Sequence, residues 1–317
     1  MAPRLTMAFV MDPIGSIDIE KDTTFLFMWE AQQRGHRVLY VDPADLCVFE
    51  RRAAARARPV KLRREVGNHV DLGPVETLLL DDDVDVAWQR KDPPVDENYV
   101  VATQILGLCR RTVVLNRPHG ILAHNEKIYA LEFADLMAET AVTRRIPELL
   151  DFLAEVGGEM IVKPLDGKGG EGIFHVTADD RNLYSILETA TAFGRRWTMA
   201  QRYLPAVREG DKRILLLEGE PLGALLRIPA EGETRSNLHV GGKPRAAVLD
   251  EADRAIVAAI APSLRANGLF FVGIDVIGGK LTEINVTSPT GVQEINAIEG
   301  VALERAVIDA AEQRAAG

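Results

Sequence analysis

The segment from residue 270 to 290 constrains the fold more than any other part of the chain. Two apolar runs flank Gly278 and Gly279, and this pattern is typical of a β-hairpin. Asp275, Glu283 and Asn285 are set into the apolar runs. Carboxylates in an apolar strand are costly unless a cation pairs with them, and Mg²⁺ prefers oxygen ligands. The segment therefore predicts a metal-binding hairpin, with an edge hairpin of solvated acids as the alternative.

The turn decides whether these side chains can meet. Side chains alternate along a strand, so Glu283 and Asn285 share one face. A three-residue loop at 278–280, with a bulge glycine, would place Asp275 opposite Glu283. A two-residue Gly-Gly turn would place Asp275 on the other face and weaken the metal interpretation.

Length and composition set broad limits. A chain of 317 residues predicts two or three domains, and a net charge of −10 argues against a nucleic-acid partner. Cys47 and Cys109 indicate neither a disulfide framework nor a cysteine metal site. The amino terminus lacks the pattern of a signal peptide, and no apolar run approaches the roughly 18 residues that span a bilayer. We therefore expect a protein of the reducing cytoplasm with no membrane partner.

Residues 1–122 predict an open parallel sheet of the α/β class. A strand at 5–11 precedes a helix that Asp22 caps and Gly35 ends, and a strand at 38–41 follows. No G-x-G-x-x-G follows the first strand, so no dinucleotide site is predicted. Further elements of this part are expected at 84–88 (strand), 97–109 (helix) and 112–115 (strand).

Three features of this first part are interpreted less specifically. The Arg- and Ala-rich residues 50–70 indicate an excursion or a short hairpin, and the acidic run 81–83 a solvated turn. Phe25 and Trp29 lie on one helix face, which could be a subunit contact or ordinary core.

After residue 122 the pattern changes, and two further α+β units are expected, at 123–200 and 201–317. A helix should begin at Asn125 and run to about Met137. A polar, glycine-rich stretch is expected to form a loop at 229–245. The other expected helices are 147–156, 181–193, 250–267 and 300–315; the other expected strands are 160–164, 172–176, 197–201, 211–218 and 222–228.

The second strong signal is K-P-L-D-G-K-G-G-E-G-I-F at 163–174. Its glycines, Gly167, Gly169, Gly170 and Gly172, let backbone N–H groups converge on an anion. The loop joins two strands and lacks the G-x-x-x-x-G-K-[ST] spacing, so it is not a Walker A loop. We expect a lid over a triphosphate, with Lys163 at the phosphates; a plain glycine-rich turn is the alternative.

Several cationic residues acquire interest only beside that loop. Lys127 could be a second phosphate partner, although a lone lysine is usually solvated. Arg227 lies in an apolar strand, which suggests a buried anion or an internal salt bridge. Asp211 and Arg213 point the same way by alternation. Arg235 lies in the polar loop, which could close over a reaction centre or be a disordered surface loop.

The order of these signals resembles the ATP-grasp ligases and, within them, the bacterial glutathione synthetase family. The resemblance runs almost from end to end. It rests on M-D-P-I at 11–14, R-K-D-P-P at 90–94, N-E-K at 125–127, K-P-L-D-G-x-G-G at 163–170, Q-x-Y-L-P at 201–205, G-D-K-R at 210–213, R-I-P at 227–229, G-E-T-R-x-N-L at 232–238 and T-E-I-N-V-T-S-P-T at 282–290.

The resemblance implies an N-terminal Rossmann-like domain followed by two ATP-grasp domains. It implies an ADP-forming ligase that joins γ-glutamylcysteine and glycine through an acyl phosphate, with Mg²⁺ or Mn²⁺. Arg213, Arg227 and Arg235 would be catalytic, and Arg213, Arg227, Ser288, Pro289 and Thr290 would bind substrate. Asp275, Glu283 and Asn285 would hold the metal. The implied nucleotide contacts are Lys127, Lys163, Asp166, Gly167, Gly169, Gly170, Gly172, Gln201, Tyr203, Leu204 and Asp211.

Two other functions are compatible with parts of this pattern. A ligase for another acid and amine would share the ATP-grasp residues, but G-E-T-R and R-K-D-P-P favour glutathione. A non-catalytic nucleotide-binding module would be expected to lose part of the metal set or the arginines, all of which are present. Gln293 is a departure, since some relatives are expected to carry arginine there. Family members are commonly homo-oligomers, so a dimer or tetramer is expected.

Overall fold

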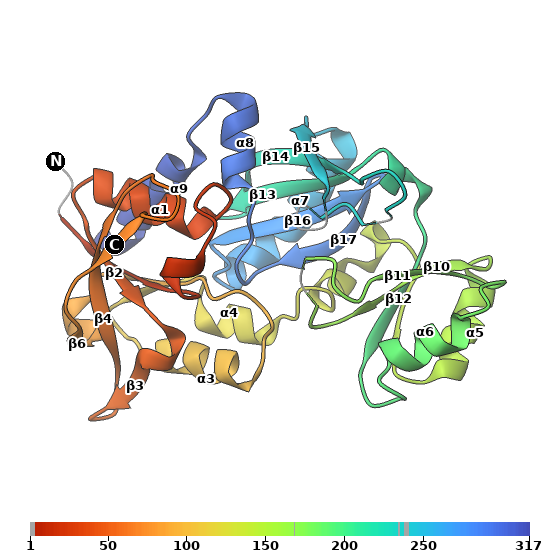
Figure 1. The fold of residues 1–317 in the computed structure, drawn as a ribbon, viewed down its shortest axis with the longest axis horizontal. Coiled ribbons are helices and arrows are strands. Elements are labelled where there is room, and N and C mark those ends of the chain that lie inside the picture. The colour runs from red at the N-terminus through yellow and green to blue at the C-terminus, as the bar shows by residue number, and fades with distance from the viewer. Residues whose placement is uncertain (1–3, 168, 234, 238–240) are drawn as a thin grey trace.

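The computed structural model describes residues 4–167, 169–233, 235–237 and 241–317. Three sheets follow one another along the chain, and Figure 1 shows the third sheet between the other two. Within the described residues, no helix has the length and apolar character needed to cross a membrane. The mixed α/β class expected from the sequence is confirmed.

The first sheet has the predicted parallel centre. Its strands β1, β2, β7 and β8 pair in parallel, in the order β2-β1-β7-β8. Asp22 caps the first helix by accepting a hydrogen bond from the Phe25 N–H at 2.6 Å. Phe25 is fully buried and Trp29 packs against the same core. The elements are β1 (Thr6–Val10), α1 (Thr23–Gln33), β2 (Arg37–Val41), β7 (Val86–Gln89), α3 (Glu97–Leu106) and β8 (Val113–Leu115).

The short hairpin expected at residues 50–70 is present, because residues 60–62 pair with residues 70–72, but the segment contributes more than that to the sheet. It contains β4 (Arg52–Leu62), a long antiparallel strand of the same sheet that pairs with β2. Ala53, Ala54 and Ala55 are all buried, so this strand lacks the alternation that marks a one-sided strand. β4 also pairs with β3 (Leu46–Phe49), β5 (Val70–Leu72) and β6 (Glu76–Leu79).

The acidic run 81–83 was expected as a solvated turn; Asp82 and Asp83 are exposed, but the backbone is helical. It forms a short helix, α2 (Leu80–Asp83). The Asp81 carboxylate accepts hydrogen bonds from the backbone N–H groups of Arg110, Arg111 and Thr112. These bonds lower the pKa of Asp81 although burial opposes them.

The second sheet is antiparallel, in the order β11-β10-β12-β9, and helices α5 and α6 accompany it (Figure 1). The domain limits 1–122, 123–200 and 201–317 stay a prediction. β12 crosses the expected limit between residues 200 and 201. The elements are β9 (Thr140–Thr143), α5 (Ile146–Glu155), β10 (Glu159–Pro164), β11 (Phe174–Thr177), α6 (Leu183–Ala190) and β12 (Thr198–Arg202).

The helix expected from Asn125 to Met137 is not formed as predicted. A 3₁₀ segment, η3 (Tyr129–Leu136), takes its place, and Phe133 within it has non-helical dihedral angles. Residues 125–127 are outside it because the Glu126 carbonyl accepts a hydrogen bond from the Ile284 N–H at 3.0 Å. A short helix, α4 (Pro118–Ala123), precedes this segment.

The third sheet is antiparallel, in the order β15-β14-β13-β16-β17. The last helix returns to the first sheet and packs on α1 (Figure 1). The elements are β13 (Asp211–Leu217), β14 (Glu220–Ile228), β15 (Lys243–Ala246), α7 (Glu251–Ala266), β16 (Phe271–Ile277), β17 (Lys280–Asn285), α8 (Val292–Glu299) and α9 (Leu303–Ala316). Short 3₁₀ turns are η1 (Ile14–Ser16), η2 (Pro43–Asp45) and η4 (Pro205–Arg208).

In the β16–β17 hairpin, Asp275 and Glu283 share one face as predicted, but a different turn from the predicted three-residue loop brings this about. Asp275 lies opposite Glu283, but the turn is the two-residue Gly278-Gly279 turn, since Ile277 pairs with Lys280. The register shifts by one residue next to Asp275, where Thr282 is the extra residue of a β-bulge. The bulge restores the face that a two-residue turn alone would have reversed.

Candidate functional site

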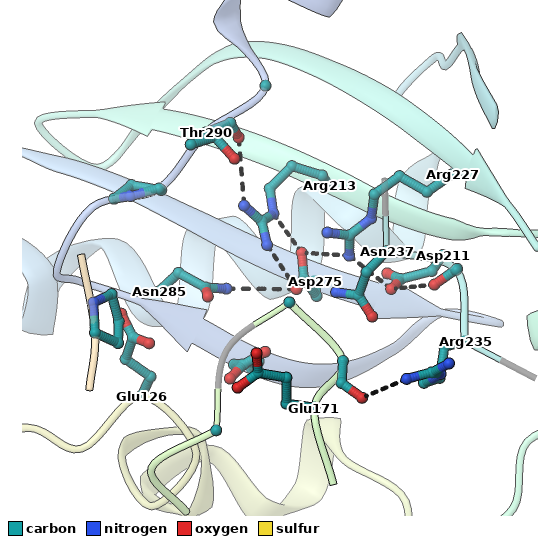
Figure 2. A pocket seen from close by; sticks show the side chains of 18 of the residues that line it. Glu126, Glu171, Asp211, Arg213, Arg227, Arg235, Asn237, Asp275, Asn285 and Thr290 are labelled. Carbon is teal, nitrogen blue, oxygen red and sulfur yellow. Dashed lines mark hydrogen bonds and ion pairs between the residues drawn. The ribbon is translucent and has the colours of Figure 1, made fainter. Parts of the chain in front are cut away.

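A cavity of about 800 Å³ is lined by strands of the second and third sheets and by the segments that follow β1 and β7 of the first sheet. Most of the predicted site residues line it (Figure 2), whereas Asp166 and Gly172 of the glycine-rich loop do not. The predicted residues along its wall are Lys127, Lys163, Gly167, Gly169, Gly170, Gln201, Tyr203, Leu204, Asp211, Arg213, Arg227, Arg235, Asp275, Glu283, Asn285, Ser288, Pro289 and Thr290.

Asp275 is the centre of the charged wall (Figure 2). Arg213 binds it through two contacts, Nε to Oδ1 at 2.5 Å and Nη2 to Oδ2 at 2.9 Å. Arg227 Nη2 lies 2.9 Å from the same Oδ1. Burial by itself would raise the pKa of Asp275, but the two guanidinium groups hold it well below its usual range. The carboxylate therefore balances two buried cations.

The strand register explains this arrangement. Asp211 pairs with Arg227 across β13 and β14, and Arg213 pairs with Asp275 across β13 and β16. Arg227 Nη2 also lies 2.6 Å from Asp211 Oδ2, which accepts a second hydrogen bond from Ser236 Oγ at 2.8 Å. The predicted common facing of Asp211 and Arg213 is thus confirmed. The internal salt bridge weighed for Arg227 is present, and burial raises the pKa of Asp211 despite it.

Glu283 and Asn285 complete the predicted metal set. Lys127 Nζ lies 2.9 Å from Glu283 Oε1 and donates to the Gly167 carbonyl at 3.0 Å. Burial opposes the charge of Lys127, but Glu283 raises its pKa. Asn285 Nδ2 donates to Asp275 Oδ2 at 3.4 Å.

The donor set of this hairpin fits a hard cation, because it offers two carboxylates and an amide oxygen on one cavity wall. Across the described residues, this hairpin included, no group of three or more His, Cys, Asp or Glu side chains gathers in a way that could hold a metal ion, so Asn285 would have to supply the third ligand here. The carboxylates are held by arginine and lysine side chains, so a cation would have to share or replace these partners.

Lys163 lies on β10 of the second sheet and lines the cavity from that strand. Its Nζ is 3.3 Å from Gln201 Oε1 and 3.4 Å from the Thr282 carbonyl, and burial lowers its pKa. Gln201 Nε2 in turn donates to Thr140 Oγ1 at 3.0 Å. The Tyr203 ring stacks on the His175 ring, with centroids 4.1 Å apart. The sequence had suggested no role for His175.

The two loops of the cavity touch each other (Figure 2). Arg235 donates to the Gly170 carbonyl at 3.2 Å and pairs with Glu233 at 2.7 Å. A Cβ at Gly170 would lie 2.8 Å from Asn237 Oδ1, so a side chain there would clash. Of the predicted loop residues, Lys168, Thr234 and Leu238 lie outside the described residues.

Several further charged residues line the cavity and received no role from sequence reasoning, and Glu126 is one of them. The Glu126 carboxylate accepts three hydrogen bonds, from the backbone N–H groups of Val286 and Thr287 and from Thr287 Oγ1. Burial raises its pKa. The sequence feature that could have indicated a role for Glu126 is its position in the N-E-K motif, next to Lys127.

Arg90 is a second charged residue that sequence reasoning missed, and its signal was R-K-D-P-P. Its buried guanidinium donates to Thr24 Oγ1 at 3.0 Å and to the Pro289 carbonyl at 2.9 Å. Arg213 donates to the next carbonyl, that of Thr290, at 3.3 Å. Ser288 Oγ donates to the Arg90 carbonyl at 3.2 Å. The two arginines therefore fix the Ser288–Thr290 segment from two sides.

Comparison with protein families gives matches along nearly the whole chain. The model of the prokaryotic glutathione synthetase N-terminal domain matches residues 5–121, and that of the ATP-grasp domain of prokaryotic glutathione synthetase matches residues 126–300.

Curated relatives agree with these matches. The glutathione synthetase of Gloeobacter violaceus is 46% identical and covers 96% of each chain. Those of Salmonella typhimurium, at 44% identity, and Brucella melitensis, at 45% identity, cover 98% of this chain and 99% of their own.

Solved structures show the fold alone, because sequence identity is low. A D-cycloserine synthetase has a TM-score of 0.68 at 16% identity and covers 98% of this chain and 99% of its own. The D-alanine–D-alanine ligase of Bacillus anthracis complexed with ATP has a TM-score of 0.59 at 14% identity, with 98% of both chains covered. The chain therefore has the ATP-grasp ligase fold.

Proposed function

The chain belongs to the prokaryotic glutathione synthetase family, and we propose that its cavity is where ATP drives the joining of γ-glutamylcysteine to glycine. The activity is that of an ADP-forming ligase of glutathione biosynthesis. The observation that carries the site assignment is the gathering of four cations, Lys127, Lys163, Arg213 and Arg227, with a glycine-rich loop in one cavity. Such a set suits a polyphosphate and a carboxylate.

ATP would lie between the second and third sheets. Lys127 and Lys163 would meet its phosphates, under the loop that carries Gly167, Gly169 and Gly170. Asp166 and Gly172 would act by shaping that loop. Gln201, Tyr203 and Leu204, where β12 ends, would face the adenine, and Asp211 would close this side. The proposal is supported by the contact of Lys127 with the Gly167 carbonyl, which already holds the loop against the lysine.

Mg²⁺, with Mn²⁺ as a possible substitute, would be held by Asp275, Glu283 and Asn285. When bound, the ion would neutralise phosphate charge next to Lys127. Arg213 and Arg227 would then be released from Asp275 in part, and their free donors would become available to substrate.

The acid substrate would lie along Ser288, Pro289 and Thr290. Its carboxylate oxygen attacks the γ-phosphorus of ATP, the bond to the β-phosphate oxygen breaks, and ADP leaves. Arg213 and Arg227 orient the carboxylate and stabilise the charge on the phosphoryl oxygens, and Arg235 closes over the site from its loop. The amine of glycine then attacks the acyl carbon and loses a proton, and phosphate departs. Closure matters because an acyl phosphate hydrolyses in water.

Two expectations beyond the site belong to this proposal. We propose a homo-oligomer, a dimer or tetramer, and a reducing cytoplasm as the location. Sedimentation of the purified chain tests the first, and cell fractionation tests the second.

The decisive experiment measures ADP release from the purified chain with ATP, Mg²⁺, γ-glutamylcysteine and glycine, omitting each in turn. We expect ADP only when all are present, with glutathione formed in equal amount. ADP formed without glycine at the same rate, or no ADP with the full set, would contradict the proposed reaction. A reaction in which D-alanine replaces both γ-glutamylcysteine and glycine serves as the control for a different ligase.

A further inference from the structure

Gln293 lies in the first turn of α8. It connects this helix to the loop between β1 and α1 in the first part of the chain. Its Nε2 donates to the Ile19 carbonyl at 2.6 Å and to the Asp22 carbonyl at 2.8 Å. The amide nitrogen carries two hydrogens, so both are used. The side chain is buried but is not among the residues that line the cavity. Any influence on the reaction must therefore act through what it holds.

The loop that it holds connects β1 to α1 and forms one wall of the cavity. Ser16, Asp18, Lys21 and Asp22 line the cavity from this loop. In the part of the chain that the structure describes, the other hydrogen bonds found for residues 17–22 stay local, such as Lys21 Nζ to Asp18 Oδ2 at 3.0 Å and the Asp22 N–H to the Asp18 carbonyl at 2.8 Å. Such local bonds fix the shape of the loop. Beyond the loop, Arg90 bridges Thr24 at the start of α1 and the Pro289 carbonyl.

The opposite wall is the segment that leads directly into α8. Gly291 precedes the helix with a φ of 124°, and Ser288–Thr290 lie immediately before it. Gln293 is therefore three residues beyond Thr290 on a rigid helical turn. Its two hydrogen bonds hold the loop at 17–22 directly, whereas Arg90 joins the same segment to Thr24, beyond the end of the loop. Lys163 and Gln201 lie on the second sheet, which these bonds do not reach.

We propose that Gln293 is a positioning residue for the acid substrate. It holds the loop at 17–22 against the Ser288–Thr290 wall and so sets the affinity for γ-glutamylcysteine, while ATP binding does not depend on it. This inference rests on the proposed function.

The test compares Gln293→Ala and Gln293→Glu with Asn296→Ala. Both Gln293 variants lose the two donated hydrogen bonds, since a carboxylate cannot donate to a carbonyl. Asn296 lies one turn further along α8 and ties it to α9, through Nδ2 to Glu304 Oε2 at 2.6 Å. We expect the Gln293 variants to raise the KM for γ-glutamylcysteine about tenfold, because two buried hydrogen bonds are lost. The KM for ATP and kcat should stay within about twofold, and Asn296→Ala should change neither KM.

An unchanged KM for γ-glutamylcysteine in Gln293→Ala, or an equal rise for ATP, would overturn the proposal. So would the same rise in Asn296→Ala. Hydrogen exchange of the backbone amides at 17–22 separates this from a failure of the proposed function. If the wild-type chain does not turn over γ-glutamylcysteine, the proposed function fails; faster exchange at 17–22 in Gln293→Ala alone would still support the anchoring, and unchanged exchange would contradict it.

Discussion

At the scale of single residues, charge compensation organises the cavity. Asp275 has no solvent to stabilise it, and two guanidinium groups do so in its place. Glu283 is less buried, with 20% of its side chain exposed, and its ion-pair partner among the described residues is Lys127. The two carboxylates predicted to bind the metal, Asp275 and Glu283, therefore differ in how much the stability of the folded state depends on them.

The charge at Asp275 should be structural as well as catalytic. Asp275→Asn keeps the shape but removes the carboxylate that pairs with the buried Arg213, and it leaves Arg227 with Asp211 as its carboxylate partner, so we expect the free energy of unfolding to fall by about 3 kcal/mol. Glu283→Gln should cost about 1 kcal/mol, because only one ion pair is lost and water reaches it. Urea unfolding of both variants measures this, and ADP release should be sharply lower in both. Equal stabilities would contradict the difference in compensation.

At the scale of elements, the β16–β17 hairpin carries the site. Gly278 and Gly279 have φ of 56° and 73°, a conformation that side chains disfavour. A Cβ at Gly278 would lie 2.8 Å from Ala206 Cβ, whereas one at Gly279 would meet Ala252 Cβ at an ordinary 3.4 Å. The turn is thus confined at its first residue by packing and at its second by the backbone alone.

Alanine at the two turn positions should separate these effects. We expect Gly279→Ala to cost about 1 kcal/mol from the positive φ, and Gly278→Ala about 2 kcal/mol because the clash with Ala206 is added. Thermal unfolding gives the order of the two variants. ADP release at a temperature where both are folded should be close to wild type, since the bulge at Thr282 and not the turn sets the facing of Asp275 and Glu283. The reverse order of stability would show that packing against Ala206 does not matter.

At the scale of the whole molecule, the C-terminal helix joins the third part of the chain to the first. Arg34 on α1 donates to Glu30 at 2.8 Å, to Glu312 at 3.1 Å and to the Arg305 carbonyl at 2.9 Å. His36 Nε2 lies 2.8 Å from the same Glu312 carboxylate. These contacts tie α9 to the sheet whose loop forms one wall of the cavity, so the relative position of the two walls depends on them.

Removing this tie should loosen the molecule without touching the cavity. We expect Arg34→Ala to lower the free energy of unfolding by about 1–2 kcal/mol, because several partly buried partners are lost together. Arg314 on α9 provides the matched control: its ion pair with Glu218 is exposed, so Arg314→Ala should cost less than about 0.5 kcal/mol. Urea unfolding compares the two. A cost for Arg314→Ala as large as that for Arg34→Ala would contradict a special role of Arg34.

Much of the site could be predicted from the sequence, because its chemistry is local in the chain. Carboxylates in an apolar hairpin, a cluster of glycines after a lysine, and an arginine in an apolar strand are each costly unless a ligand or a partner needs them. The same argument located the parallel centre of the first sheet, where continuous apolar runs alternate with a capped helix. The specific roles of these residues stay a proposal.

Tertiary structure decided what local patterns could not express. The facing of Asp275 toward Glu283 depends on the bulge at Thr282, which the letters of a hairpin do not reveal. The helix expected from Asn125 gives way because the Glu126 carbonyl accepts a hydrogen bond from Ile284 of β17, more than 150 residues away in the chain. β4 could not be predicted from its sequence, because consecutive alanines on both of its faces are buried and the alternation typical of a strand is absent. The sequence by itself determined which chemical groups are present and which must be paired; only the folded chain decided which pairs meet, because pairing depends on contacts that the order of residues does not encode locally.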